Sequence, residues 1–120
     1  MAGISDLKRF REGMGYTDSV GQRYWDRYLG IANQSDSALS AISPIEHVGA
    51  LAAPVLLIHG ADDTVVPYLQ SSLMERALKS ANKRVEFVTL KHEDHWLSGS
   101  QTRLQMLEAS VEFLSKYNPP

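Results

Sequence analysis

The chain has 120 residues, of which 43% are hydrophobic and 22% charged, so its composition is ordinary for a globular protein and its length suits one domain at most. Its 12 basic and 14 acidic residues are interspersed and give a formal charge of -2, which provides no electrostatic attraction for a nucleic-acid backbone or an anionic membrane. The lack of cysteine excludes disulfides, thiolate metal sites and cysteine nucleophiles.

The N-terminus lacks the charged start and apolar run of a signal peptide, and no apolar stretch approaches the ~20 residues that span a bilayer. The sequence therefore predicts a soluble chain with no targeting segment and no nucleic-acid or membrane partner. Its compartment is not predicted, because cysteine-free proteins occur in oxidising and reducing compartments alike.

One helix and one loop are predicted in the first part of the chain. Ser19 to Leu29 has the spacing of a helix that Gly30 closes, with apolar side chains along one side: Val20, Tyr24 and Tyr28. The polar stretch Gln34 to Ser40 predicts a loop. Ser43-Pro44-Ile45-Glu46 then combines a capping-box pattern with proline at the first helical position, which predicts a short helix from Pro44 toward Val48.

The second half predicts two strands that alternate with two helices. Val55 to His59 is a continuous apolar run of the kind buried on both faces of a parallel sheet, and Val85 to Leu90 is rich in β-branched and aromatic residues. Tyr68 to Ser80 predicts an amphipathic helix with its polar side formed by Gln70, Glu75, Arg76 and Lys79. A final helix from about Thr102 to Tyr117 carries one apolar stripe: Leu104, Leu107, Val111 and Leu114.

This order predicts an α/β fold with parallel strands and right-handed crossovers. Ligands of such sheets bind beyond the carboxyl ends of the strands, where the segments Gly60 to Pro67 and Lys91 to Ser100 fall. Both segments contain groups suited to acid-base chemistry. A buried Asp can orient a His through its Nδ1–H and stabilise the imidazolium that forms when the His takes a proton from a serine.

The residues alone leave alternatives open. Asp63 could cap its own turn, and the adjacent Asp62 is a rival carboxylate. The pair His92-x-x-His95 could indicate a metal, but its ligand set matches no recognised site, so we expect neither metal nor cofactor. His95 could be a hydrogen-bonded loop histidine, and we expect serines near it, Ser98 and Ser100, to cap the last helix.

The motif His59-Gly60-x-x-Asp63-x-x-Val66-Pro67, followed 32 residues after the Asp by His95, resembles the end of an α/β-hydrolase, whose triad follows the order Ser, Asp, His. Three further motifs resemble the prolyl oligopeptidase family, particularly its dipeptidyl-peptidase and acylaminoacyl-peptidase branches: Tyr24-Trp25-Asp26-Arg27-Tyr28-Leu29-Gly30, Ser43-Pro44-Ile45 and Glu93-Asp94-His95. The segment Ala2 to Leu7 resembles the end of the family's sixth strand.

The resemblance implies that Asp63 is the triad acid and His95 the general base, and that Tyr24 and Val66 line the pocket for the residue before the scissile bond. The family's serine lies in a Gly-x-Ser-x-Gly motif, which this sequence does not contain. We therefore expect residues 1–120 to be the C-terminal part of an α/β-hydrolase catalytic domain with an incomplete sheet.

The expected function is that of a fragment of a serine peptidase that hydrolyses short peptides, inactive by itself because the nucleophile and oxyanion donors lie elsewhere. A fragment of another α/β-hydrolase such as an esterase, and a non-catalytic self-associating module, are the alternatives. Because two strands and an incomplete third leave apolar edges exposed, we also expect the isolated chain to self-associate.

Overall fold

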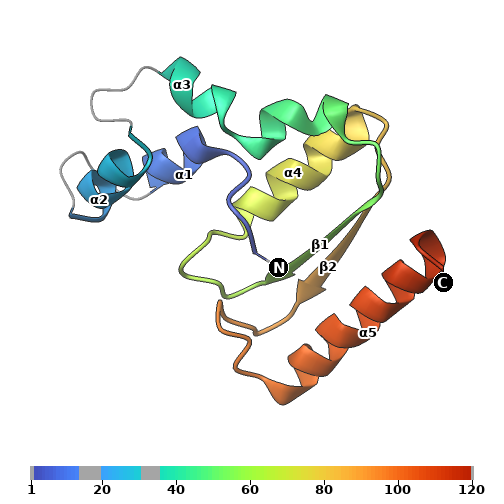
Figure 1. Cartoon of the computed structure of the whole chain (residues 1–120). Coiled ribbons are helices and arrows are strands. Elements are labelled where there is room, and N and C mark those ends of the chain that lie inside the picture. The colour runs from blue at the N-terminus through green and yellow to red at the C-terminus, as the bar shows by residue number, and fades with distance from the viewer. Residues whose placement is uncertain (1, 14–19, 31–35, 120) are drawn as a thin grey trace.

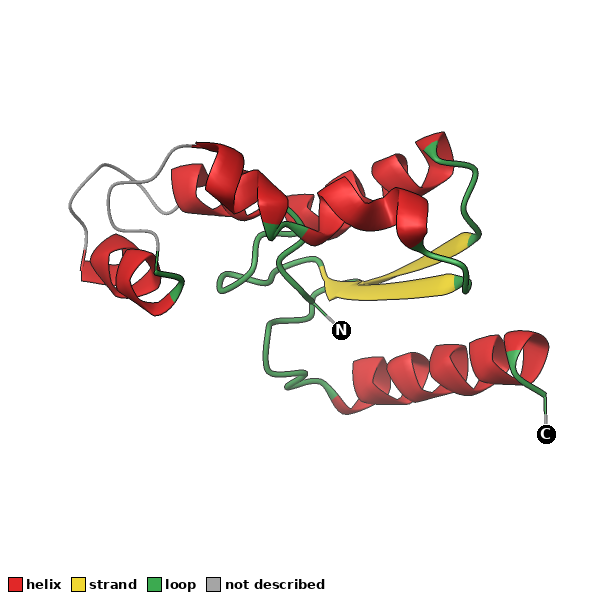
Figure 2. Cartoon of the chain, turned by 45° about the horizontal axis from the view of Figure 1, so that its top comes forward, coloured by secondary structure: helices red, strands yellow, loops and turns green. Residues whose placement is uncertain are grey.

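The computed structural model describes residues 2–13, 20–30 and 36–119. Two parallel strands, β1 (Val55–Gly60) and β2 (Val85–Leu90), pair in register from Val55 opposite Val85 to Gly60 opposite Leu90. Helix α4 (Leu69–Ser80) connects them and lies over one face, whereas α5 (Ser100–Tyr117) lies over the other (Figure 1). The view in Figure 2 shows the same three layers, so the predicted α/β order and both strands are confirmed.

The described residues contain no third strand. Residues 2–6, predicted to resemble a strand end, form no strand and lead into α1 (Leu7–Gly13). Their backbone is held by Gln70 of α4, whose Oε1 accepts the amide hydrogens of Ser5 and Asp6 at 3.0 and 2.8 Å. The prediction that Gln70 lies on the polar outer side is therefore wrong: its amide is buried because it satisfies these two donors.

The predicted loop from Gln34 to Ser40 is also wrong, because helix α3 (Asp36–Ala41) occupies most of it, while residues 34 and 35 lie outside the described part. Leu39 is buried where α3 packs against α1. The Ser43 hydroxyl then ties the two helices, since it donates to the carbonyl of Leu39 and accepts the amide hydrogen of Leu7. One leucine in a polar stretch was too weak a signal for a helix.

The predicted helix at Pro44 is present as the 3-10 helix η1 (Pro44–Ala50). The capping-box interpretation is wrong, because the Ser43 side chain makes no capping hydrogen bond to η1. Its hydroxyl is already used between α1 and α3.

Helix α2 (Val20–Tyr28) confirms the predicted segment, and Gly30 after it has a positive φ of 67°, as a helix-closing glycine should. Its described aromatic side chains form a cluster in which Tyr24 stacks on Tyr28 and Trp25 meets Phe10 of α1 edge to face. Arg11 of α1 and Asp26 of α2 form a bidentate ion pair at 2.8 and 2.9 Å.

Helix α5 begins two residues earlier than predicted, and its apolar stripe faces solvent. The stripe residues Leu104, Leu107, Val111 and Leu114 are each 54–56% exposed. Contact with the sheet is made from another side of the helix, where Tyr117 donates its hydroxyl hydrogen to Glu86 of β2 at 3.0 Å. The final helix is therefore apolar on a face that nothing described here covers.

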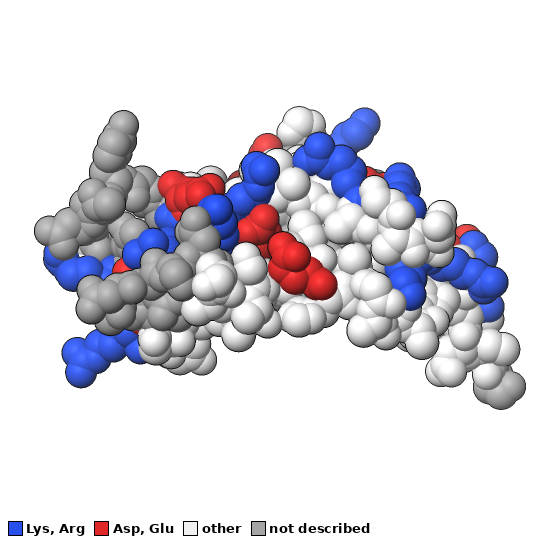
Figure 3. Space-filling view, turned by 90° about the horizontal axis from the view of Figure 1, so that it is seen from above, with Lys and Arg blue, Asp and Glu red and all other residues white. Residues whose placement is uncertain are grey.

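Acidic and basic side chains are mixed on the face seen from above in Figure 3. Within residues 2–13, 20–30 and 36–119, no helix is both long and apolar enough to cross a membrane.

Candidate active site

The loops that follow β1 and β2 meet at the carboxyl end of the sheet. Asp62 donates its amide hydrogen to the carbonyl of Glu93 at 3.0 Å, and Ala61 donates to the carbonyl of Leu90 at 2.9 Å. Gly60 permits this approach: a Cβ there would lie 2.4 Å from the carbonyl oxygen of Glu93, well inside contact distance. The glycine therefore allows the two loops to close on each other.

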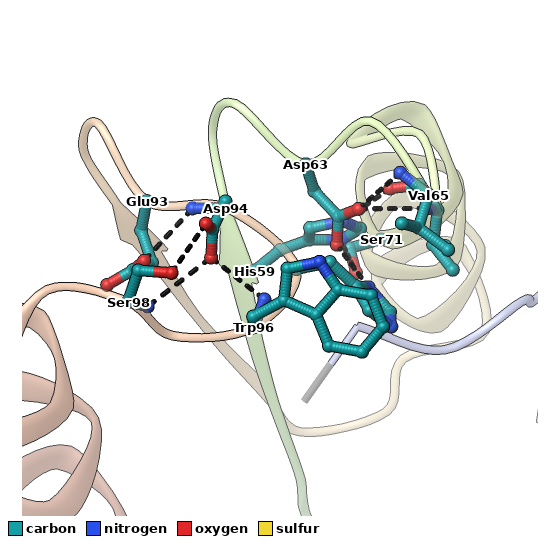
Figure 4. A network of polar contacts seen from close by, with 10 residues as sticks. His59, Asp63, Val65, Ser71, Glu93, Asp94, Trp96 and Ser98 are labelled. Carbon is teal, nitrogen blue, oxygen red and sulfur yellow. Dashed lines mark hydrogen bonds and ion pairs between the residues drawn. The ribbon is translucent and has the colours of Figure 1, made fainter.

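Asp63 is the carboxylate at this junction, and its side chain is only 1% exposed. Its Oδ1 accepts the amide hydrogens of Val65 (Figure 4) and Val66, both at 2.8 Å, while Oδ2 lies 2.9 Å from Nδ1 of His95. Two amides of the loop after β1 thus fix Oδ1, and Oδ2 faces His95 in the loop after β2.

The surroundings of Asp63 keep it ionised. Burial pushes the pKa of Asp63 upward, but hydrogen bonds from the Val66 amide, the His95 ring and the Val65 amide together outweigh burial and hold the pKa below its ordinary value. An ionised carboxylate can only accept hydrogen bonds, so His95 must donate its Nδ1–H to Asp63.

His95 is presented with its other nitrogen available. The side chain is 26% exposed, unlike the buried carboxylate beside it. With Nδ1 protonated, the neutral ring carries its lone pair at Nε2, the position from which a histidine takes a proton. Trp96 meets the His95 ring edge to face at 5.1 Å and is itself 75% exposed.

The loop that carries His95 is shaped by the two carboxylates before it. Asp94 accepts the amide hydrogens of Trp96 and Ser98 and the Ser98 hydroxyl hydrogen at 2.7 Å, and these hydrogen bonds lower the pKa of Asp94. Glu93 is buried and accepts from the amides of Asp94 and Gly99 and from the hydroxyl of Thr102. In Figure 4, Glu93, Asp94 and Ser98 gather on one side of the site, with Asp63 on the other.

Comparison with known protein families identifies the family of the chain. The model of the prolyl oligopeptidase family matches residues 2–118. The chain belongs to the prolyl oligopeptidase family. No curated protein matches its sequence.

Solved structures share the fold of this chain. A puromycin-hydrolyzing peptidase of Mycobacterium tuberculosis superposes with a TM-score of 0.80 and 31% identity over 96% of this chain and 17% of its own. The acylaminoacyl peptidase of Pyrococcus horikoshii superposes with a TM-score of 0.80 and 24% identity over 97% and 19%. Esterase 2 of Thermogutta terrifontis, phosphonylated by sarin, has a TM-score of 0.66 and 26% identity over 98% and 43%.

The chain thus spans less than a fifth of those peptidases and less than half of that esterase. Its two-stranded sheet with flanking helices is part of an α/β-hydrolase domain, as the sequence predicted.

Of the residues singled out in this family member, Asp63, His95 and Val66 lie together and Tyr24 lies apart. Val66 is buried in the loop after β1, and its amide holds Asp63. Tyr24 is on α2, which both Figure 1 and Figure 2 place away from the carboxyl ends of the strands, and the residue is 62% exposed. The rival Asp62 is exposed and lies 3.8 Å from the ring of His92.

The alternatives for the neighbouring histidine and serines have different outcomes. The His92 side chain is 93% exposed, and its Nδ1 lies 3.8 Å from the carboxylate of Asp62. In the part of the chain described, no three His, Asp or Glu side chains are grouped as metal ligands. The prediction that serines cap α5 is wrong, since its N-cap is Gly99 with no side-chain cap and Ser98 bonds Asp94 instead.

The sequence reasoning missed the buried supports of the site. His59 and Glu93 are each about 1% exposed. From the sequence, His59 had no predicted role beyond its place in the motif at the end of a strand. The position of a histidine at the end of an apolar run could have indicated a supporting role in the site, because a buried ring needs hydrogen-bond partners for both nitrogens.

Proposed function

We propose that residues 1–120 form the C-terminal part of the catalytic domain of a serine peptidase and supply the Asp and His of a Ser-Asp-His triad. Asp63 is the triad acid and His95 the general base, while the nucleophilic serine lies outside this chain. The observation that carries the proposal is the 2.9 Å contact between Nδ1 of a partly exposed His95 and Oδ2 of a buried, doubly held Asp63. Such an acid orients the ring and stabilises the imidazolium.

In the complete enzyme, Nε2 of His95 takes the proton of the serine hydroxyl as its oxygen bonds to the substrate's carbonyl carbon. The same nitrogen then gives that proton to the leaving amine as the C–N bond breaks and an acyl-enzyme forms. Water repeats the sequence and releases the acid. Asp63 stays ionised throughout, which its lowered pKa supports.

The substrate class proposed is short peptides, from which the enzyme removes dipeptides or acylated residues. Tyr24 and Val66 are proposed to line the pocket for the residue before the scissile bond. The position of Val66 directly beside the acid supports its part of this assignment, whereas Tyr24 lies on α2, apart from the Asp63–His95 pair.

A second candidate is an esterase of the same fold. The similarity to Thermogutta terrifontis esterase 2, which covers 98% of this chain, supports it. The same two side chains would then serve ester hydrolysis, because acyl transfer needs the same base and acid.

The chain by itself is proposed to be inactive, since removing the serine of such a triad costs on the order of a millionfold in turnover. The test is labelling of the purified chain with a fluorophosphonate, together with assays on acetyl-alanine p-nitroanilide and p-nitrophenyl butyrate. We expect neither labelling nor hydrolysis. Labelling of one serine that disappears when His95 is changed to Gln would contradict the proposal, because it would reveal a nucleophile within the chain.

A further inference from the structure

His59 is a buried histidine that the proposed reaction does not use. It lies at the end of β1, its side chain is 0% exposed, and both ring nitrogens have partners. Nδ1 lies 2.7 Å from the hydroxyl of Ser71 on α4, and Nε2 lies 2.9 Å from the carbonyl oxygen of Val66 in the loop after β1. The ring therefore connects a strand, a helix and the loop that carries Asp63.

The partners fix where the proton of the neutral ring sits. A backbone carbonyl can only accept a hydrogen bond, so Nε2 must carry the hydrogen and donate it to Val66. Nδ1 is then the acceptor, and the Ser71 hydroxyl donates to it. Ser71 is itself buried, so this chain of hydrogen bonds has no water to replace its members.

His59 binds the backbone of Val66, the residue whose amide binds Asp63. The carbonyl of Val66 accepts from His59, while the amide of Val66 donates to Oδ1 of Asp63 at 2.8 Å. Nε2 of His59 also lies 3.4 Å from Oδ2 of Asp63, the oxygen that faces His95. His59 thus approaches the carboxylate both through the Val66 peptide and directly.

We propose that His59 is a positioning residue for the Asp63–His95 pair: it fixes the Val66 peptide so that the Asp63 carboxylate presents Oδ2 to the Nδ1–H of His95. The inference rests on the proposed function, because it assigns His59 to the same site. A purely structural role would need only the shape of the ring, which packs against Tyr68 with centroids 5.5 Å apart. Positioning needs the two hydrogen bonds.

The experiment is proton NMR of the 120-residue chain, observing the Nδ1–H resonance of His95 and the exchange rate of the Val66 amide hydrogen. His59→Phe keeps an aromatic ring but removes both hydrogen bonds. His59→Gln keeps a donor that reaches Val66 and an acceptor for Ser71. His92→Gln is the matched control, since the His92 ring is 93% exposed and lies outside this network.

We expect the wild-type chain, His92→Gln and His59→Gln to show the His95 resonance, and His59→Phe to lose it. The Val66 amide should exchange about tenfold faster in His59→Phe, as expected for the loss of one hydrogen bond worth about 1.4 kcal/mol. If His59→Phe fails to fold, Ser71→Ala decides, because it removes only the hydroxyl that orients the ring and should also speed exchange of the Val66 amide.

Two results would overturn the inference in different ways. A folded His59→Phe chain that keeps the resonance and the slow Val66 exchange would reject the role of His59 and leave the proposed triad intact. A wild-type chain with no Nδ1–H resonance from His95 would reject the Asp63–His95 pair, and the proposed function with it.

Discussion

Asp63 stands at the centre of the site because three donors converge on a carboxylate that water barely reaches. Two of them are amides of its own loop, so a turn within that loop orients the side chain independently of the loop after β2. The family resemblance of the sequence implied that Asp63 and His95 act together, whereas their positions after neighbouring strands left Asp62 open as a rival. It could not predict that Val66 acts through its backbone, since backbone contacts leave no mark on residue type.

Replacing Asp63 with Asn should destabilise the chain by about 1–3 kcal/mol, because an amide nitrogen would face the Nδ1–H of His95 and leave a buried donor unpaired. Urea unfolding at neutral pH measures this cost. Asp62→Asn is the matched control, and its effect should stay within about 0.5 kcal/mol because that side chain is largely exposed. Equal costs for the two variants would contradict the buried pairing of Asp63.

The lowered pKa of Asp63 predicts a stability that depends on pH. A carboxyl whose pKa is lower in the folded state stabilises the fold above its unfolded pKa of about 3.9, and this contribution is lost as the pH falls through the folded pKa. Asp26, whose pKa is lowered by its hydrogen bonds from Arg11, adds in the same direction. Melting temperatures between about pH 3 and pH 7 should therefore fall toward acid, and less steeply in Asp63→Asn. Parallel curves for the two proteins would refute the assignment.

At the scale of elements, the site depends on how closely the loop after β2 can approach the end of β1. Both strands were predictable because a continuous apolar run and a β-branched run are strong signals. Helix α3 was not, because it buries a single leucine, and no element was predicted for residues 8–13, which form most of α1. The polar sides of helices were misjudged where a buried side chain such as Gln70 satisfies a distant backbone.

Gly60→Ala should destabilise the chain by about 1–3 kcal/mol, because its new methyl group would meet the backbone carbonyl of Glu93, which cannot move aside alone. It should also weaken the contact between His95 and Asp63. Gly49→Ala is the control, as a methyl group there meets nothing within 4 Å. Thermal unfolding of both variants measures the difference, and a Gly60→Ala chain as stable as Gly49→Ala would show that the two loops do not pack as described.

Glu93→Gln should destabilise the loop after β2. The Glu93 carboxylate accepts hydrogen bonds from two amides and from the Thr102 hydroxyl, and the glutamine side chain would place an NH₂ donor against one of these donors. We expect a cost of about 1–3 kcal/mol in urea unfolding. The exposed Glu108→Gln serves for comparison and should be nearly neutral. No difference between them would mean that the Glu93 carboxylate does not organise the loop.

At the scale of the whole molecule, the described part leaves one edge of the sheet and one apolar face of α5 uncovered. In that part β1 pairs with β2 alone, so no described strand borders its other edge, and the α5 stripe is exposed. The sequence predicted a helix from this stripe but not which way it faces, because periodicity identifies an apolar side without saying what covers it. The incomplete sheet was predictable, as an α/β-hydrolase needs more strands than this length supplies.

We propose that the isolated chain self-associates through the α5 stripe. Leu104, Leu107, Val111 and Leu114 follow the alternating spacing of three and four residues that lets one helix pack against a second copy. Light scattering after gel filtration should give a mass above 13.4 kDa that rises with concentration. Leu107→Glu should shift the chain toward monomer, whereas Gln105→Glu, which adds the same charge outside the stripe, should not. A monomer at every concentration would contradict this proposal.

The most direct test of the central claim is a transplant into the Mycobacterium tuberculosis peptidase, in which the 96% of this chain that superposes replaces the matching segment. Puromycin hydrolysis by this chimera is measured alongside versions that carry His95→Gln, Asp63→Asn or the control His92→Gln. The account predicts an active chimera in which the first two changes each lower kcat by about 10⁴-fold or more and the control has little effect. A folded chimera that is inactive, or one whose rate survives His95→Gln, would contradict it.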